Sequence, residues 1–207
     1  MEANSAWRYG YAGLLLIAVL VLSGCGEGRL ETLGPDDRIL AFGDSLTEGY
    51  GVAPGQSYPV QLAQITGLEV INAGVSGEET SEGLARLEQV LQREAPQLVL
   101  LLEGGNDILR NRNAAQIREN LAQMIEQIRA SGAQVVLIGV PEKNLFSSVA
   151  PVYRELAEQY DLVFIDTLIA DLLRTARYKS DQVHFNALGY RALAEGIAER
   201  LEAEGAF

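Results

Sequence analysis

From Arg38 onward, the chain alternates between short apolar runs and longer segments with helical periodicity. Five of these runs are mostly apolar on both faces, as are strands buried inside a parallel sheet. They are Arg38–Phe42, Glu69–Asn72, Leu98–Glu103, Gln134–Ile138 and Leu162–Ile165. Strands that alternate with helices predict β-α units stacked around a parallel sheet, and therefore a doubly wound α/β domain.

Apolar residues recur at helical spacing between the predicted strands, and we interpret these stripes as core. The stripes are Leu84/Leu87/Leu91, Ile117/Leu121/Ile125/Ile128 and Leu193/Ile197/Leu201. We expect the first helix to end before Pro96, the second to end before Gly132, and the last to be capped by Asn186. Because ligands of such folds bind at the carboxyl ends of the strands, function is expected in the loops that follow the strands.

The size and charge of the chain narrow the class of protein. The 207 residues are enough for one domain with a full core, and we assign residues 38–207 to it. The 28 acidic residues outnumber the 16 basic ones and give a formal net charge of -12. Such a chain repels a polyanion, so nucleic-acid binding is excluded.

The N-terminus has the pattern of an export signal. Ala12–Leu22 is an unbroken apolar run, too short for a permanent transmembrane helix and typical of a signal peptide. It ends in Leu-Ser-Gly-Cys25, which resembles the lipobox of bacterial lipoproteins, where the cysteine is acylated. We therefore predict a signal peptide over residues 1–24, lipidation at Cys25, and a Gly-rich, charged tether over residues 25–37. The mature protein would then be exported and membrane-anchored, facing the periplasm or the cell surface. The alternative for the apolar run is a buried helix, and the alternative for Cys25 is a free buried thiol.

A serine lies at the exit of the first strand, in the sequence Gly-Asp-Ser45-Leu-Thr-Glu-Gly. A nucleophile needs an exposed position of this kind, although serine after aspartate is also common in turns and at helix N-caps. The sequence is not the Gly-x-Ser-x-Gly elbow, because Thr47 replaces the second glycine, which disfavours the α/β-hydrolase fold.

The single histidine of the chain, His184, lies near the C-terminus, three residues after Asp181. An activated serine needs a base and a carboxylate that orients the base. The spacing lets Asp181 reach Nδ1 of His184 while Nε2 stays free for a serine. We therefore predict a Ser45–His184–Asp181 catalytic triad.

Two glycine-containing loops offer hydrogen-bond donors for an oxyanion. The first follows the second strand and contains Gly74, where the backbone N–H is able to approach a ligand closely. The second follows the third strand and contains Asn106, whose side-chain amide is a donor. Acyl transfer needs such donors beside its nucleophile.

Together these four blocks resemble the SGNH or GDSL hydrolase family, over roughly Arg38 to Leu201. The resemblance implies that Ser45 attacks and that its own backbone N–H, together with Gly74 and Asn106, forms the oxyanion hole. It further implies that Asp181 and His184 complete the triad and that no metal or organic cofactor is needed. It also implies a flavodoxin-like three-layer α/β/α sandwich with strand order 2-1-3-4-5. Within the family, the blocks are most similar to the bacterial arylesterase, thioesterase and lysophospholipase branch.

Two features depart from that branch. Glu103 precedes the Gly-Gly-Asn106 block where an apolar residue is usual, and we interpret it as an outward-facing strand end, the alternative being an altered substrate polarity. The loop after the fourth strand also differs, and Leu145 and Phe146 in it either line an acyl pocket or cover the core.

The sequence therefore favours an anchored serine hydrolase that cleaves carboxylic ester or thioester bonds of small esters or single-chain lipids, such as lysophospholipids, through an acyl-enzyme. One alternative is a carbohydrate O-acetylesterase of the cell envelope, which the carboxylate of Glu103 slightly favours because it suggests a polar cleft. The other is a non-catalytic envelope binding protein, which the intact catalytic residues disfavour.

Overall fold

The computed structural model describes residues 29–143 and 148–207. Its five strands form one parallel sheet in the order β2-β1-β3-β4-β5. The strands are β1 (Arg38–Gly43), β2 (Glu69–Gly74), β3 (Leu98–Leu102), β4 (Gln134–Ile138) and β5 (Val163–Ile165). The predicted strands, their order and the three-layer fold are confirmed; β4 has the predicted bounds, and each of the other strands differs at one end by one or two residues.

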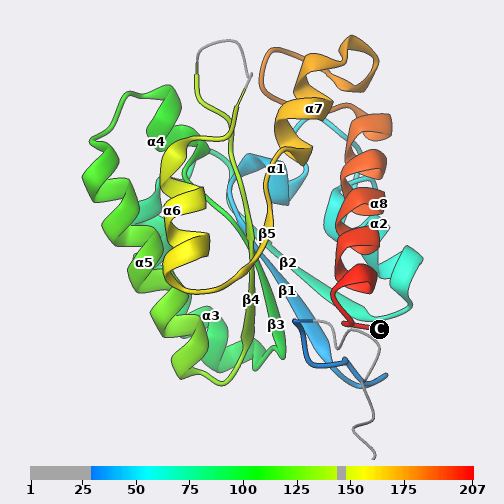
Figure 1. The fold of residues 1–207 in the computed structure, drawn as a ribbon. Helices are drawn as coiled ribbons and strands as arrows, with labels where there is room; N and C mark the ends of the chain where they lie inside the picture. The colour runs from blue at the N-terminus through cyan, green and yellow to red at the C-terminus, as the bar shows by residue number, and fades with distance from the viewer. Residues whose placement is uncertain (1–28, 144–147) are drawn as a thin grey trace, which may run out of the picture.

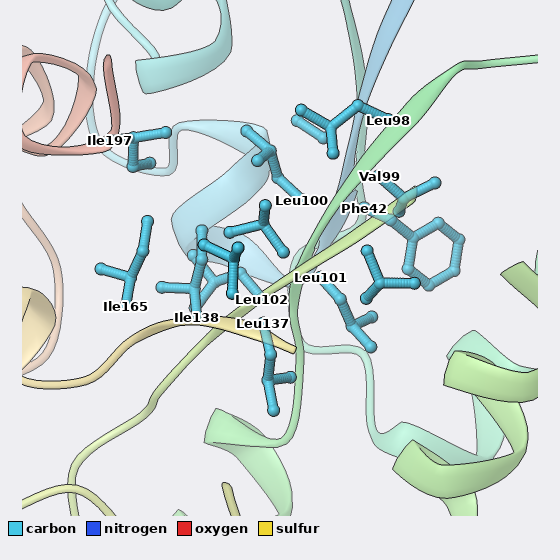
Figure 2. Close-up of a cluster of buried hydrophobic side chains, with 14 of the residues drawn as sticks. Phe42, Leu98, Val99, Leu100, Leu101, Leu102, Leu137, Ile138, Ile165 and Ile197 are labelled. Carbon is cyan, nitrogen blue, oxygen red and sulfur yellow. The ribbon is translucent and has the colours of Figure 1, made fainter. Parts of the chain in front are cut away.

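The centre of the sheet is the centre of the core. All five side chains of β3 are fully buried, and Figure 2 shows them with Phe42 and apolar residues of the neighbouring elements. The register pairs Gly43 of β1 with Gly74 of β2 and with Leu102 of β3. The three loops that follow these strands therefore leave the sheet side by side.

Helices cover both faces of the sheet (Figure 1). One layer holds α2 (Tyr58–Thr66), α7 (Leu168–Arg174) and α8 (Ala187–Ala203), and the other holds α3 (Thr80–Glu94), α5 (Ala114–Ala130) and α6 (Pro151–Gln159). Short helices α1 (Ser45–Glu48) and α4 (Gly105–Leu109) follow β1 and β3, and a 3-10 turn spans Ala176–Tyr178. The expected ends of α3 and α5 are confirmed, as is the Asn186 cap of α8, where the side chain accepts from Gly189 N.

Within residues 29–143 and 148–207, no helix has the length and apolar character needed to cross a membrane.

Residues 29–37, which the sequence predicts to be part of a tether, are instead packed on the domain. Leu30 and Leu33 are buried, and their N–H groups donate to the carbonyls of Glu204 (3.0 Å) and Ala206 (2.8 Å). Arg29 pairs with Asp161 at 2.5 Å. The segment from Arg29 is therefore part of the folded domain, at the end of the sheet opposite α4 and α7 (Figure 1). Cys25 and the predicted signal peptide lie outside the described residues.

Candidate active site

Ser45 is the first residue of α1, directly after β1. The Asp44 side chain caps this helix by accepting from Leu46 N at 2.9 Å, and Gly49 ends it in the left-handed conformation (φ 96°). The turn is tight, because a Cβ atom at Gly43 would lie 2.1 Å from the Leu102 carbonyl oxygen. Ser45 is consequently held at the carboxyl edge of the sheet, where the residue is 9% exposed.

His184 lies in a loop closed by an antiparallel bridge between Lys179 and Phe185. Ser180 N donates to the His184 carbonyl at 3.0 Å, which tightens the loop. The Phe185 side chain is fully buried and packs edge-on against Tyr190, so it fixes the loop to α8. The backbone of His184 is thereby held over the end of β1.

The predicted triad is assembled in the structure. His184 Nε2 lies 3.1 Å from Ser45 Oγ, and His184 Nδ1 lies 2.7 Å from Asp181 Oδ2. Both distances suit hydrogen bonds in which the Ser45 hydroxyl donates to Nε2 and Nδ1–H donates to the carboxylate. This contact joins residues 139 positions apart in the chain.

Asp181 is held as a carboxylate by its own loop. Its Oδ1 accepts from the backbone N–H groups of Val183 and His184, both at 2.8 Å. Partial burial alone would raise the pKa of Asp181, but the hydrogen bonds from the His184 ring and the two N–H groups lower it below its ordinary value. The ring of Tyr50 lies on the His184 ring, with centroids 4.5 Å apart, and completes the positioning of the imidazole.

Asn106 provides one donor of the expected oxyanion hole. Its Nδ2 donates one hydrogen to the Glu78 carbonyl at 2.9 Å, which fixes the amide and leaves the second hydrogen for a ligand. Among the described residues, the Ser45 N–H has no acceptor either. Two of the three predicted donors are therefore available beside the triad.

The N–H of the third predicted donor, Gly74, is already engaged in this structure. Its N–H already donates to the Asn72 side chain at 2.9 Å, and a Cβ atom here would lie 2.0 Å from Glu48 N. Gly74 thus serves the close packing of β2 against α1. Gly77, in the loop after β2, has a left-handed backbone (φ 81°), and its N–H has no acceptor within the part of the chain that the structure describes. Its neighbour Glu78 binds Asn106, so Gly77 is the better candidate, signalled in the sequence only by a second glycine in the loop.

A pocket of about 80 Å³ opens beside Ser45 and His184. Most of its wall is apolar and comes from α4, the loop after β4, α7 and the His184 loop: Ile108, Leu109, Val140, Pro141, Ile169, Leu173 and Val183. Lys143 closes one side, where its Nζ donates to the Leu109 carbonyl at 2.8 Å. Leu145 and Phe146 lie outside the described residues.

The interpretation of Glu103 as an outward-facing strand end is wrong. Its side chain is fully buried, because α3 and α6 cover the end of β3. It does not line the pocket beside Ser45, so it gives that pocket no polarity.

Residues 41–192 match the GDSL-like lipase/acylhydrolase family. The chain belongs to this family. It is 32% identical over 176 residues to an arylesterase of Vibrio mimicus, covering 80% of this chain and 88% of the relative. It is 28% identical over 174 residues to thioesterase 1/protease 1/lysophospholipase L1 of Escherichia coli K12, covering 80% and 84%.

Solved structures agree with this assignment. A TesA structure superimposes with a TM-score of 0.75 at 28% identity, covering 81% of this chain and 99% of TesA. AlinE4, an SGNH-hydrolase family esterase, superimposes with a TM-score of 0.63 at 33% identity, covering 83% and 97%. The protein is therefore an SGNH-family esterase/lipase hydrolase, as predicted.

The buried carboxyl group of Asp44 makes stability depend on pH. Burial raises its pKa to about 6, although the Leu46 N–H and His184 oppose the shift. Because the unfolded value is lower, ionised Asp44 destabilises the native state above pH 6, and this cost decreases as pH falls from 6 to 4. We expect Asp44→Asn, which keeps the cap, to lose about 1–3 kcal/mol of stability relative to wild type between pH 7 and pH 4.

Thermal unfolding of both proteins at several pH values measures this difference, and Asp36→Asn, exposed at the far end of the domain, is the control. A difference between Asp44→Asn and wild type that stays constant with pH would contradict the assigned shift.

Proposed function

We propose that this hydrolase cleaves the carboxylic ester bonds of small esters or single-chain lipids, and also thioester bonds, through an acyl-enzyme on Ser45. The observation that carries the proposal is the 3.1 Å contact between His184 Nε2 and Ser45 Oγ, with Asp181 on the other ring nitrogen. This is the arrangement by which a serine hydroxyl becomes a nucleophile at neutral pH.

The reaction follows from this arrangement. Ser45 Oγ attacks the acyl carbon while its proton moves to His184 Nε2, and the imidazolium is stabilised by Asp181. The oxyanion receives hydrogen bonds from the N–H groups of Ser45 and Gly77 and from the Asn106 amide. His184 then protonates the leaving alcohol or thiol, and it later takes a proton from the water that hydrolyses the acyl-enzyme.

The apolar pocket favours an acyl chain as the group that is bound. Its wall of Ile108, Leu173 and similar side chains stabilises methylene groups and gives a sugar hydroxyl few partners. The buried position of Glu103 removes the argument for a polar cleft, and with it the main reason to favour a carbohydrate O-acetylesterase. The assembled triad disfavours a non-catalytic binding protein.

A larger side chain in the pocket tests whether the acyl chain binds there. Ile108 is partly buried at the pocket wall, and Ile108→Trp is expected to lower kcat/KM for an octanoyl ester about 10-fold more than for an acetyl ester. Both p-nitrophenyl esters are assayed, and Ile65→Trp, at an exposed site on α2, is the control. Equal losses on both esters would show that the acyl chain does not occupy this pocket.

We further propose that Cys25 carries a lipid anchor, a proposal that rests on the lipobox-like sequence. Arg29 follows Cys25 by four positions, so the two residues lie at most about 14 Å apart. The anchor would then hold the end of the domain opposite Ser45 near the membrane, so that substrates reach Ser45 from the aqueous side. Cys25→Ala is expected to move the protein from the membrane fraction to the soluble fraction; unchanged partition after removal of peripheral proteins would refute the anchor.

A further inference from the structure

Behind the expected oxyanion hole lie three charged or titratable side chains with no part in the proposed acyl transfer. Arg86 of α3 binds both carboxylate oxygens of Glu78, with Nε 2.6 Å from Oε1 and Nη2 2.5 Å from Oε2. The Glu78 side chain is 4% exposed and that of Arg86 is 24% exposed. A two-point ion pair with this burial fixes the orientation of both side chains.

Arg86 also contacts the ends of two strands. Its Nη2 donates to the Ala73 carbonyl at 2.9 Å and lies 3.5 Å from the Gly43 carbonyl. Its guanidinium group lies over the Phe42 ring, 4.0 Å from the centroid. Gly43 leads into the turn that holds Ser45, and Ala73 leads into the loop that holds Gly77, so one side chain ties both loops together.

Glu78 carries the connection on to Asn106. Its side chain is held by Arg86, while its backbone carbonyl accepts from Asn106 Nδ2 at 2.9 Å. The position of the Asn106 amide therefore depends on the position of Glu78, which depends on Arg86.

Glu103 adds a second carboxyl group to this site. Its Oε2 accepts from Gly104 N at 3.0 Å, whereas its buried Oε1 has no donor among the described residues. A Cβ atom at Gly83 would lie 3.4 Å from both this Oε1 and Glu78 Oε2, so the two carboxyl groups face the same small space. A proton on Oε1 would turn this unpaired acceptor into a donor, and the Glu78 carboxylate that faces the same space would be its acceptor.

The charges around Glu103 favour its protonated form. Burial, reinforced by the negative charges of Asp44 and Glu78, raises its pKa well above the ordinary value of a glutamate. Arg86 already pairs with Glu78, and Asp107 on α4 adds a further carboxylate, held by Thr80. From α6, Tyr153 donates to the backbone carbonyl of Glu103 at 2.6 Å and brings no positive charge.

We propose that Arg86, Glu78 and Glu103 form a positioning network for the oxyanion hole. Arg86 and Glu78 hold the three loops that carry its donors, and Glu103 holds a proton that it shares with Glu78. The expected effect of this network on kcat rests on the proposed function. The protonation of Glu103 is independent of that function.

The kinetic test compares Arg86→Gln, Glu78→Gln and the double variant, with Glu88→Gln, exposed on α3, as the control. Each single variant is expected to lower kcat for p-nitrophenyl acetate about 10- to 100-fold with KM changed less than about threefold, because donors are displaced while the acyl pocket is intact. The double variant is expected to lose no more than the worse single variant, since the residues act as a unit.

A kcat for Arg86→Gln equal to that of the control, or losses that multiply in the double variant, would overturn the network. If Arg86→Gln does not fold by circular dichroism, Arg86→Lys replaces it. Lysine keeps the charge but cannot make the two-point contact, so a loss of about fivefold is expected and an unchanged kcat overturns the proposal.

The proton is tested by infrared spectroscopy at pH 8, where Asp44 is ionised. The wild type is expected to show the carbonyl-stretch band of a buried protonated carboxylic acid, and Glu103→Gln to lack it. Glu103→Gln is also expected to keep about 10-fold more kcat than Glu103→Ala, because its amide N–H replaces the acid O–H. Absence of the band in wild type, its persistence in Glu103→Gln, or equal kcat values would overturn the role of Glu103. Failure of the proposed function would appear instead as ester turnover that does not depend on Ser45.

Discussion

Replacing Ser45 with alanine is expected to lower kcat for p-nitrophenyl esters by about 10⁴- to 10⁶-fold. Among the described residues, His184 Nε2 has one hydrogen-bond partner, the Ser45 hydroxyl at 3.1 Å. Removal of this hydroxyl leaves the base without a nucleophile to activate. The oxyanion donors and the pocket are unchanged, and they account for the residual rate. Steady-state kinetics measure the loss, and Ser131→Ala, an exposed serine after α5, is the control.

A second measurement separates loss of the nucleophile from loss of the fold. An activated phosphonate ester is expected to add one covalent group to the wild type by mass spectrometry and none to Ser45→Ala, while the thermal unfolding of both proteins stays similar. Turnover or labelling at the wild-type level in Ser45→Ala would remove Ser45 from the mechanism.

The next largest effect is expected from Asp181→Asn, which should lower kcat by about 10³- to 10⁴-fold. The asparagine keeps the shape of the side chain, but it removes the negative charge that stabilises the imidazolium, and its amide favours the wrong tautomer of His184. The Asp181 side chain is 48% exposed, so the substitution leaves the core intact.

The kcat of Asp181→Asn is measured beside that of Asp36→Asn, which makes the same change at the opposite end of the domain. A loss of less than about 10-fold in Asp181→Asn, with the protein folded, would mean that His184 is oriented by its loop and Tyr50 alone.

The fold was predictable because its signals are local. The runs that became β1, β3 and β4 are apolar on both faces, and this property depends only on neighbouring residues. Two strand boundaries differ: the local pattern predicts strands that include Glu103 and Leu162, but both residues lie just outside β3 and β5. Whether the last residue of a strand pairs depends on its neighbour in the sheet, which local sequence does not specify.

The triad was predictable for a different reason. The chain contains one histidine, with a carboxylate three residues before it, so the choice of base and orienting acid had few alternatives. The oxyanion donors had no such restriction. Gly74 ends β2 and Gly77 lies in the loop that follows, and only the packed structure distinguishes them: Gly74 N donates to Asn72 and packs against α1, whereas Gly77 N has no acceptor among the described residues.

Glu103 marks the limit of sequence reasoning most clearly. A glutamate at the end of a strand is ordinarily exposed, and nothing adjacent to it in the chain predicts otherwise. In the fold, Gly83 of α3 leaves room beside it and Glu78 shares that space, so the carboxyl group is buried.

Residue types and local spacing were thus sufficient for the chemistry, because a nucleophile, a base and an acid are properties of side chains, and for the layered fold, because apolar periodicity is local. The docked segment from Arg29, the free N–H groups around Ser45 and the buried Glu78–Arg86–Glu103 network required the packed structure. Each of these depends on residues far apart in the chain that meet only when the sheet and its two helix layers close around the core.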